Sequence, residues 1–247
     1  MRTAPPRGPE NGISVDLPER VRLRDGTEAM IWPLLPTDRS GLREHFELLS
    51  LESRYHRFMT PVPRLTETML DHLVDDVDQV DHVALVLFVL PEDEAEAPGG
   101  IARIIRYPDQ PADADVAVTV VDRWQGRGVA TALLGALMRH RPAGVTRIVT
   151  EVCTDNAASL AMLRRLGRLT VTDRSKGCLD VVVDLSEPPA AHSESDIGGA
   201  AGPPAAPEPS SRAPRQTLFQ RSAGRSVDLK DSPDEKNPSD PTDRGAR

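Results

Sequence analysis

Regularly spaced apolar residues divide the middle of the chain into strands and helices. Continuous or alternating apolar runs predict strands on either side of an Asp25-Gly26 turn and over 82–90, 99–107, 114–121, 147–153, 168–173 and 178–185. Apolar residues three or four positions apart predict helices over about 38–49, 50–59, 65–74, 129–141 and 157–167. Early helices, followed by strands with helical crossovers between the later ones, indicate a mixed sheet covered by helices.

The apolar pattern fades at both ends of the chain. Residues 1–18 are rich in Pro, Gly and charge, and residues 187–247 hold ten prolines with Phe219 as their only aromatic side chain. Such segments bury too little apolar surface to offset the entropy of ordering. We therefore expect a flexible N-terminus, one domain over 19–186 and a disordered tail. A basic patch in the tail, 211–225, is either a random basic stretch or a short docking motif.

Composition narrows the classes of function. A net charge of −8 disfavours a large nucleic-acid surface and weakly favours a cationic partner such as an amine. Cys153 and Cys178 cannot build a disulfide framework and show no metal-ligand spacing, so we expect no metal. The longest apolar run is too short to span a membrane, and the N-terminus lacks a signal-peptide core. These features predict a soluble cytoplasmic protein without a membrane or nucleic-acid partner.

The most informative segment is the turn between the strand at 114–121 and the helix at 129–141. It reads Gln125-Gly126-Arg127-Gly128-Val129-Ala130, and the helix follows at once. Backbone N–H groups at such a helix start have no intrahelical partner and lie at the positive end of the helix dipole. The two glycines permit positive φ, Ala130 is small, and Arg127 can add charge. The turn is therefore predicted to bind a phosphate or pyrophosphate.

The turn does not fit the Walker A motif, because no Gly-Lys-Ser/Thr follows it. It does not fit the dinucleotide-binding fingerprint either, because the third glycine is missing. It resembles the acyl-CoA signature of the GNAT superfamily of N-acetyltransferases, Gln/Arg-x-x-Gly-x-Gly/Ala, through Gln125, Gly128 and Ala130. The segment EVCTDNAASLAMLRRLG, 151–167, resembles the superfamily's second signature. A strand–turn–helix without a ligand is the alternative.

The resemblance implies an α/β (α+β) GNAT fold with a mixed sheet of six or seven strands, splayed fourth and fifth strands, and helices on both faces. It implies acetyl-CoA as co-substrate, with pantetheine along Val118 to Val120 and pyrophosphate on the N–H groups from Gly126 to Thr131. Asn156 would approach the acyl end or simply cap its helix. The implied cofactor-binding residues are Val118, Thr119, Val120, Gln125, Gly126, Arg127, Gly128, Val129, Ala130, Thr131, Asn156 and Ser159.

Acetylation of an amine needs a proton acceptor, because a lysine-like ammonium has a pKa near ~10.4. Asp115 occupies the position of the glutamate base of bacterial protein-lysine acetyltransferases, but it is one methylene shorter and would need a bridging water. Glu151 occupies the position of the base in acetyltransferases of ribosomal-protein N-termini. Either residue could instead be a solvated strand residue. The surrounding resemblance favours Asp115 as the catalytic residue.

Three nearby positions qualify this expectation. Leu163 stands where many family members carry a tyrosine general acid, although a thiol with a pKa near ~8.5 leaves tolerably without one. Arg168 replaces the aromatic residue that usually follows Leu-Gly, so the next strand could enter differently. Cys153 lies near the expected splay and is interpreted as a core residue.

Residues 35–86 extend the resemblance to bacterial protein-lysine acetyltransferases, which modify acyl-CoA synthetases. Their Ser-x-Glu-Ser-Arg-Tyr-x-Arg-Phe run matches residues 50–58, where Arg54, Tyr55 and Phe58 could equally pack a helix onto the sheet. Acidic residues over 75–81 could attract a lysine-bearing surface or form a solvated loop. The leading hypothesis is a protein-lysine N-acetyltransferase. The alternatives are a small-molecule amine N-acetyltransferase and a catalytically weak acyl-CoA-binding regulatory module.

Overall fold

The computed structural model describes residues 17–92, 94–175 and 177–186. The described residues exclude residues 1–16 and the whole tail over 187–247, with its basic patch. The predictions for these segments therefore stay predictions. Within the described part, no helix is both long and apolar enough to cross a membrane.

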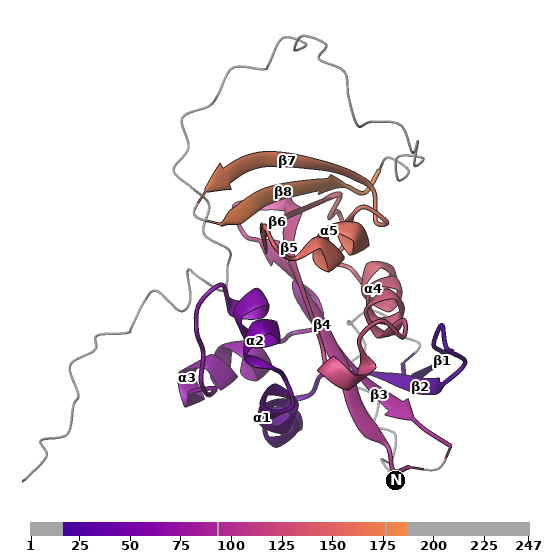
Figure 1. Cartoon of the computed structure of the whole chain (residues 1–247). Helices are drawn as coiled ribbons and strands as arrows, with labels where there is room; N and C mark the ends of the chain where they lie inside the picture. The colour runs from indigo at the N-terminus through magenta and orange to yellow at the C-terminus, as the bar shows by residue number, and fades with distance from the viewer. Residues whose placement is uncertain (1–16, 93, 176, 187–247) are drawn as a thin grey trace, which may run out of the picture.

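A single eight-stranded sheet runs through the described part of the chain in the order β1-β2-β3-β4-β5-β6-β8-β7 (Figure 1). Its strands are β1 (Glu19–Arg22), β2 (Glu28–Pro33), β3 (His82–Leu90), β4 (Ala97–Tyr107), β5 (Gln110–Val120), β6 (Arg147–Cys153), β7 (Arg168–Ser175) and β8 (Cys178–Asp184). The sheet has one strand more than the upper number expected, because β1, before the Asp25-Gly26 turn, pairs with β2 at the edge of the sheet.

The strand pairing opens between β5 and β6. β5 pairs with β4 along most of its length, from Tyr107↔Gln110 to Gly100↔Val120. Its parallel pairing with β6 consists of only two residue pairs, Asp113↔Arg147 and Ala114↔Ile148. These strands are the fourth and fifth of the expected fold, counted without β1, so the expected splay is confirmed. One edge of β5 beyond Ala114 is left without a ladder to β6.

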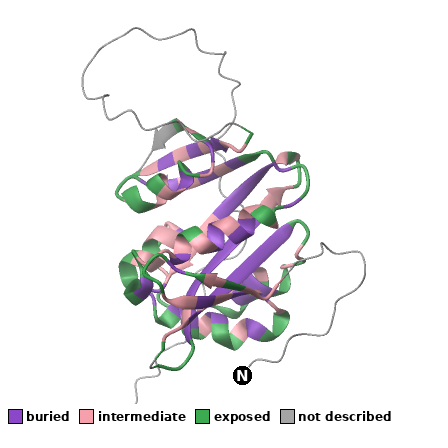
Figure 2. Cartoon of the chain, turned by 90° about the vertical axis from the view of Figure 1, so that its right-hand side faces the viewer, coloured by how far each residue is buried: buried purple, intermediate pink, exposed green. Residues whose placement is uncertain are grey.

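Helices cover both faces of the sheet (Figure 1). They are α1 (Arg39–Glu47), α2 (Leu51–Phe58), α3 (Glu67–Leu70), α4 (Val129–Arg139) and α5 (Ala157–Leu163). One core joins α1, α2 and α3 to Ala84, Val86 and Ile101 of the sheet. A second core packs α4 and α5 against the opposite face, around Leu133, Leu137 and Ile148. Figure 2 shows the buried residues concentrated in the central strands between these layers.

Several helix ends differ from the apolar pattern. The first helix follows a 3-10 turn over Pro36–Asp38, and Asp38 accepts a hydrogen bond from the Leu35 N–H at 3.0 Å without capping α1. The third predicted helix is a short α-helix followed by a π-helical turn over Asp71–Asp75. α5 ends at Leu163, before the predicted end at Gly167. A Cβ on Gly167 would overlap the Asp184 carbonyl oxygen, so only glycine lets the chain pass this close to the end of β8.

Candidate active site

A groove of about 530 Å³ collects almost all of the residues predicted to contact the cofactor. The end of β5, the turn before α4, the start of α5 and one side of α2 form its walls. The predicted residues that line it are Val118, Thr119, Val120, Gln125, Gly126, Gly128, Val129, Ala130, Thr131, Asn156 and Ser159.

The turn before α4 has the conformation that its glycines predict. Gly126 and Gly128 have φ angles of +71° and +103°. The first bond of the helix runs from the Ala132 N–H to the Gly128 carbonyl oxygen at 3.0 Å. The backbone N–H groups before Ala132 are therefore those that a helix start leaves without an intrahelical acceptor. They offer a cluster of donors to an anion in the groove.

Arg24 holds this turn in place, and sequence reasoning missed it. Its backbone N–H donates to the Arg127 carbonyl oxygen at 3.0 Å, and its guanidinium donates to the Gly126 carbonyl oxygen. A Cβ on Gly128 would lie 2.9 Å from the Arg24 nitrogen. Gly128 is therefore required for close contact with the β1–β2 turn as well as for its positive φ. No local motif marks Arg24, because its partners lie about a hundred residues later.

The Arg127 side chain, expected to add positive charge for a bound anion, contacts Asp25 and Trp124 instead. Its Nε lies 2.5 Å from Asp25 Oδ2, and its guanidinium stacks over the Trp124 ring at 4.8 Å from the centroid. Arg24 and Arg165 instead line the groove and bring positive charge to it. Arg127 contributes to the turn through its backbone.

A hydrogen-bond network connects the turn to α2. Asp122 accepts bonds from the Ser50 N–H at 2.9 Å, the Ser50 hydroxyl at 2.8 Å and the Ser53 hydroxyl at 3.1 Å. Gln125 donates to the Ser53 hydroxyl at 3.1 Å, and Ser50 also caps α2 by accepting from the Ser53 N–H. Both serines belong to the Ser-x-Glu-Ser-Arg run, which thus positions the groove.

Two further residues of that run, Arg54 and Phe58, serve packing. Arg54 donates to the carbonyl oxygens of Leu49, Pro63 and Glu47 and lies over the Phe46 ring. Phe58 is buried with its ring centroid 5.9 Å from that of Phe46. Tyr55 differs from the packing prediction, because 42% of its surface remains exposed.

Asn156 caps α5. Its side-chain oxygen accepts a bond from the Ser159 N–H at 3.0 Å, so the capping interpretation is confirmed. Asn156 and Ser159 also line the groove, and a role at the cofactor remains compatible with capping.

Asp115 lies in a smaller cavity of about 70 Å³ that adjoins the groove. The alternative of a solvated strand residue is wrong for it, since only 7% of its surface is exposed. Burial raises the pKa of Asp115 to about 6, while a hydrogen bond with Thr150 and the Arg57 charge oppose that rise. Arg57 comes from α2, and burial lowers its own pKa. A carboxyl group with a pKa near neutrality can exchange protons under physiological conditions.

Glu151 also lines this cavity and is half-buried, so the structure brings both candidate carboxylates to one place. Leu163, the residue at the expected tyrosine position, is 2% exposed and forms part of the cavity wall. Cys153 is 2% exposed, which confirms its assignment to the interior. Arg168 begins β7 and pairs in register with Asp184 of β8.

The acidic segment before β3 is engaged within the protein. Asp75 pairs with Arg39, Asp76 with His72 and Asp81 with Arg106. Asp78 accepts bonds from the N–H groups of Val80, Asp81 and His82. These partners favour a structural role for the segment over attraction of a cationic surface.

Comparison with known proteins places this geometry in a family. The family model described as "Acetyltransferase (GNAT) domain" matches residues 33–168. Acetyltransferase Pat of Mycolicibacterium smegmatis is 33% identical over 157 residues, which are 63% of this chain and 46% of that protein. Acetyltransferase PA5475 of Pseudomonas aeruginosa is 32% identical over 120 residues, which are 48% of this chain and 60% of that protein. This chain thus spans about half the length of the curated relatives it matches.

A solved structure of a GNAT domain is similar to this chain in both fold and sequence. The GNAT domain of S. lividans PAT matches with a TM-score of 0.59 and 31% identity, covering 68% of this chain and 96% of that domain. The residues that the family model matches, 33–168, include the N-terminal helices as well as the turn and α4. The chain therefore belongs to the GNAT acetyltransferase family.

Proposed function

We propose that this protein is an acetyl-CoA-dependent N-acetyltransferase that modifies lysine side chains of proteins. The observation that carries the proposal is the continuity of the groove and the carboxylate-bearing cavity. Six residues line both of them: His56, Arg57, Val118, Asn156, Ser159 and Met162. An acyl donor in the groove would therefore end next to Asp115.

The groove fits the chemical parts of acetyl-CoA. The N–H groups at the start of α4, together with Arg24 and Arg165, suit the negative charge of a pyrophosphate. The edge of β5 that lacks a ladder to β6 offers backbone groups to the amides of pantetheine. Acetyl-CoA would supply the activated acetyl group as a thioester.

Asp115 is proposed as the general base. Its pKa of about 6 leaves it mainly ionised at neutral pH, so it can accept the proton of an acceptor ammonium directly or through water. Arg57 favours the ionised carboxylate. Leu163 offers no proton to the leaving thiolate, which suits a thiol that ionises readily near neutral pH. Glu151 is the alternative base.

The dimensions of the cavity support a slender acceptor. Its volume of about 70 Å³ is far below the several hundred Å³ typical of pockets that enclose whole small molecules. A lysine side chain could enter with its amine first while the remainder of the substrate stays outside. We therefore favour a protein lysine, with acyl-CoA synthetases as the substrate class suggested by the resemblance.

The test is label transfer to protein. The purified chain is incubated with radiolabelled acetyl-CoA and a bacterial lysate depleted of small molecules, alongside an Asp115→Ala/Glu151→Ala double variant. Label on discrete protein bands that is lost with the variant would support the proposal and provide the bands for identification. Background labelling by a protein that still binds acetyl-CoA would contradict it. That result would favour a small-molecule amine acceptor or an acyl-CoA-binding regulatory module.

A further inference from the structure

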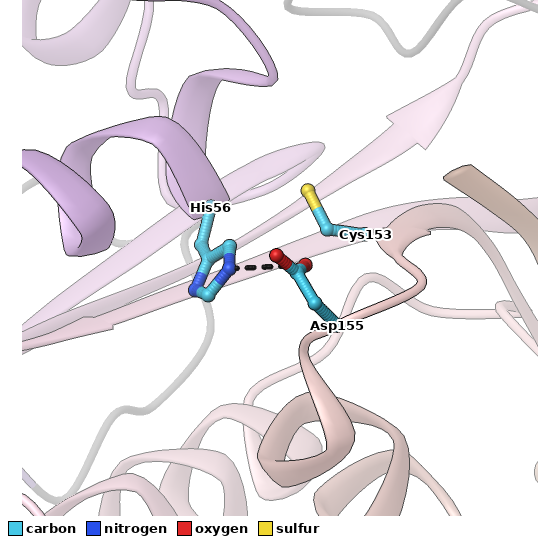
Figure 3. Close-up of side chains that lie close together, drawn as sticks. All are labelled: His56, Cys153 and Asp155. Atoms are coloured by element: carbon cyan, nitrogen blue, oxygen red, sulfur yellow. Dashed lines mark hydrogen bonds and ion pairs between the residues drawn. The ribbon is translucent and has the colours of Figure 1, made fainter. Parts of the chain in front are cut away.

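Three side chains with metal-binding atoms converge beside the groove (Figure 3). His56 belongs to the last turn of α2, Cys153 is the last residue of β6, and Asp155 follows in the turn before α5. Their donor atoms all lie within 4.8 Å of one another. His56 Nε2 and Asp155 Oδ1 are 3.2 Å apart. The first of these residues is about a hundred positions from the others, so spacing in the sequence could not reveal the cluster.

The arrangement comes close to the geometry that zinc requires. Zinc bonds of about 2.0–2.3 Å in a tetrahedral arrangement place neighbouring donor atoms roughly 3.3–3.8 Å apart. The His56–Asp155 pair is already at about that separation, and a shift of about 1 Å would bring the Cys153 sulfur into range. We propose that His56, Cys153 and Asp155 form a three-ligand Zn²⁺ site with an exchangeable solvent molecule as fourth ligand.

The donor types select zinc over the hard cations. Mg²⁺ and Ca²⁺ prefer sets of oxygen atoms, whereas an imidazole, a thiolate and one carboxylate suit zinc. Burial raises the pKa of Cys153 to about 11, so the free protein holds a neutral thiol at this position. Metal binding releases that proton to solvent and leaves the thiolate on the ion. The Met59 sulfur, 3.1 Å from the Cys153 sulfur, adds a soft neighbour.

The cluster lies where a bound ion would join two elements of the groove wall. His56 lines both the groove and the Asp115 cavity, and Asp155 lines the groove. A bound ion would therefore tie the end of α2 to the β6–α5 turn beside the junction of the two spaces. An effect of zinc on a bound acetyl donor rests on the proposed function, whereas zinc binding does not.

The experiment measures zinc affinity directly on the full chain. Protein stripped with a chelator is titrated with ZnCl₂ in competition with a chromophoric zinc indicator, without acetyl-CoA or an acceptor. We expect one zinc ion per chain and at least tenfold weaker binding in each of His56→Ala, Cys153→Ser and Asp155→Asn. His72→Ala is the matched control, because His72 forms an exposed pair with Asp76 at 2.7 Å elsewhere. Thermal unfolding of each variant separates loss of a ligand from loss of the fold.

Cobalt substitution tests the coordination itself. Co²⁺ bound at the site should show a thiolate charge-transfer absorption in wild type that disappears in Cys153→Ser. Zinc affinity that survives all three ligand substitutions, or falls equally with His72→Ala, would overturn the proposal. Because neither readout needs catalysis, a negative result here is distinct from failure of the proposed acetyltransferase activity.

Discussion

Asp115 carries its carboxyl group into a buried cavity, and its ionisation should control catalysis. In Asp115→Asn we expect kcat to fall by about 10²–10⁴-fold, because the amide cannot accept the acceptor's proton. Wild-type kcat/KM should rise with pH through about 6, the pKa of Asp115, and this inflection should vanish in the variant. Steady-state rates across pH check both expectations.

Glu151→Gln is the matched control, because Glu151 lines the same cavity. It should retain the inflection and most of the activity. The opposite pattern, with a large loss only in Glu151→Gln, would transfer the role of base to Glu151.

Asp115→Asn should also stabilise the folded protein at neutral pH. The pKa of Asp115 is about 6 in the folded protein and 3.8 as its ordinary value, so the folded state holds the proton more tightly. The stability that this proton provides is complete below pH 3.8 and is lost as the pH rises through 6. Asp115→Asn should therefore exceed wild type by about 3 kcal/mol in free energy of unfolding at pH 8, and by nearly nothing at pH 3.8. Denaturant unfolding at the two pH values measures the difference, and an equal advantage at both would contradict it.

Individual side chains were the hardest features to predict from sequence. The glycines and small residues of the turn before α4 were predictable, because a helix start that binds an anion restricts backbone geometry locally. Arg24 was not, because only the folded chain brings the β1–β2 turn to Gly126. The burial of Asp115 likewise depends on α2, which supplies Arg57 from a distant segment.

The start of α4 permits a test that separates binding from folding. Thr131 is exposed at the third position of the helix and lines the groove. Glu is favourable there for the helix, because it lies near the positive end of the dipole, yet it would repel a phosphate. Thr131→Glu should weaken acetyl-CoA binding by about tenfold or more without loss of thermal stability.

Isothermal titration calorimetry measures the affinity for acetyl-CoA. Thr131→Gln is the control, because glutamine matches glutamate in size without its charge, and it should bind acetyl-CoA nearly as well as wild type. Unchanged affinity in Thr131→Glu would exclude this helix start as the pyrophosphate site. Gly128 is a poorer position for such a test, because any side chain there meets the Arg24 backbone and disturbs the turn itself.

Elements as a whole were largely predictable from sequence. Periodicity identified the central strands and α4, because each buries one continuous apolar surface. The ends of elements depended on tertiary contacts, as at Gly167 beside Asp184. The resemblance to the family did not predict β1 as an additional strand of the sheet, although Asp25-Gly26 predicted the turn between β1 and β2.

For the whole molecule, we propose that residues 17–186 suffice for folding and activity. The buried apolar residues among those described lie between Leu23 and Val183. A chain of residues 17–186 should therefore unfold cooperatively and retain acetyl transfer, as checked by thermal unfolding and the label-transfer assay. A chain ending at residue 166 should fail to fold, because it lacks β8 and its buried Leu179, Val181 and Val183. Failure of the longer chain would show that the terminal segments support the domain.

The two-pair ladder between β5 and β6 also has a mechanical consequence. Continuous antiparallel pairing makes β1 to β5 one stiff block, and β6, β8 and β7 another. Few backbone hydrogen bonds join the blocks, so the joint depends largely on the apolar core that side chains of both blocks share with α4 and α5. A rod-shaped ligand in the opening would act as a tie between the blocks. The same missing stretch of ladder that admits a ligand would then make the rigidity of the protein depend on that ligand.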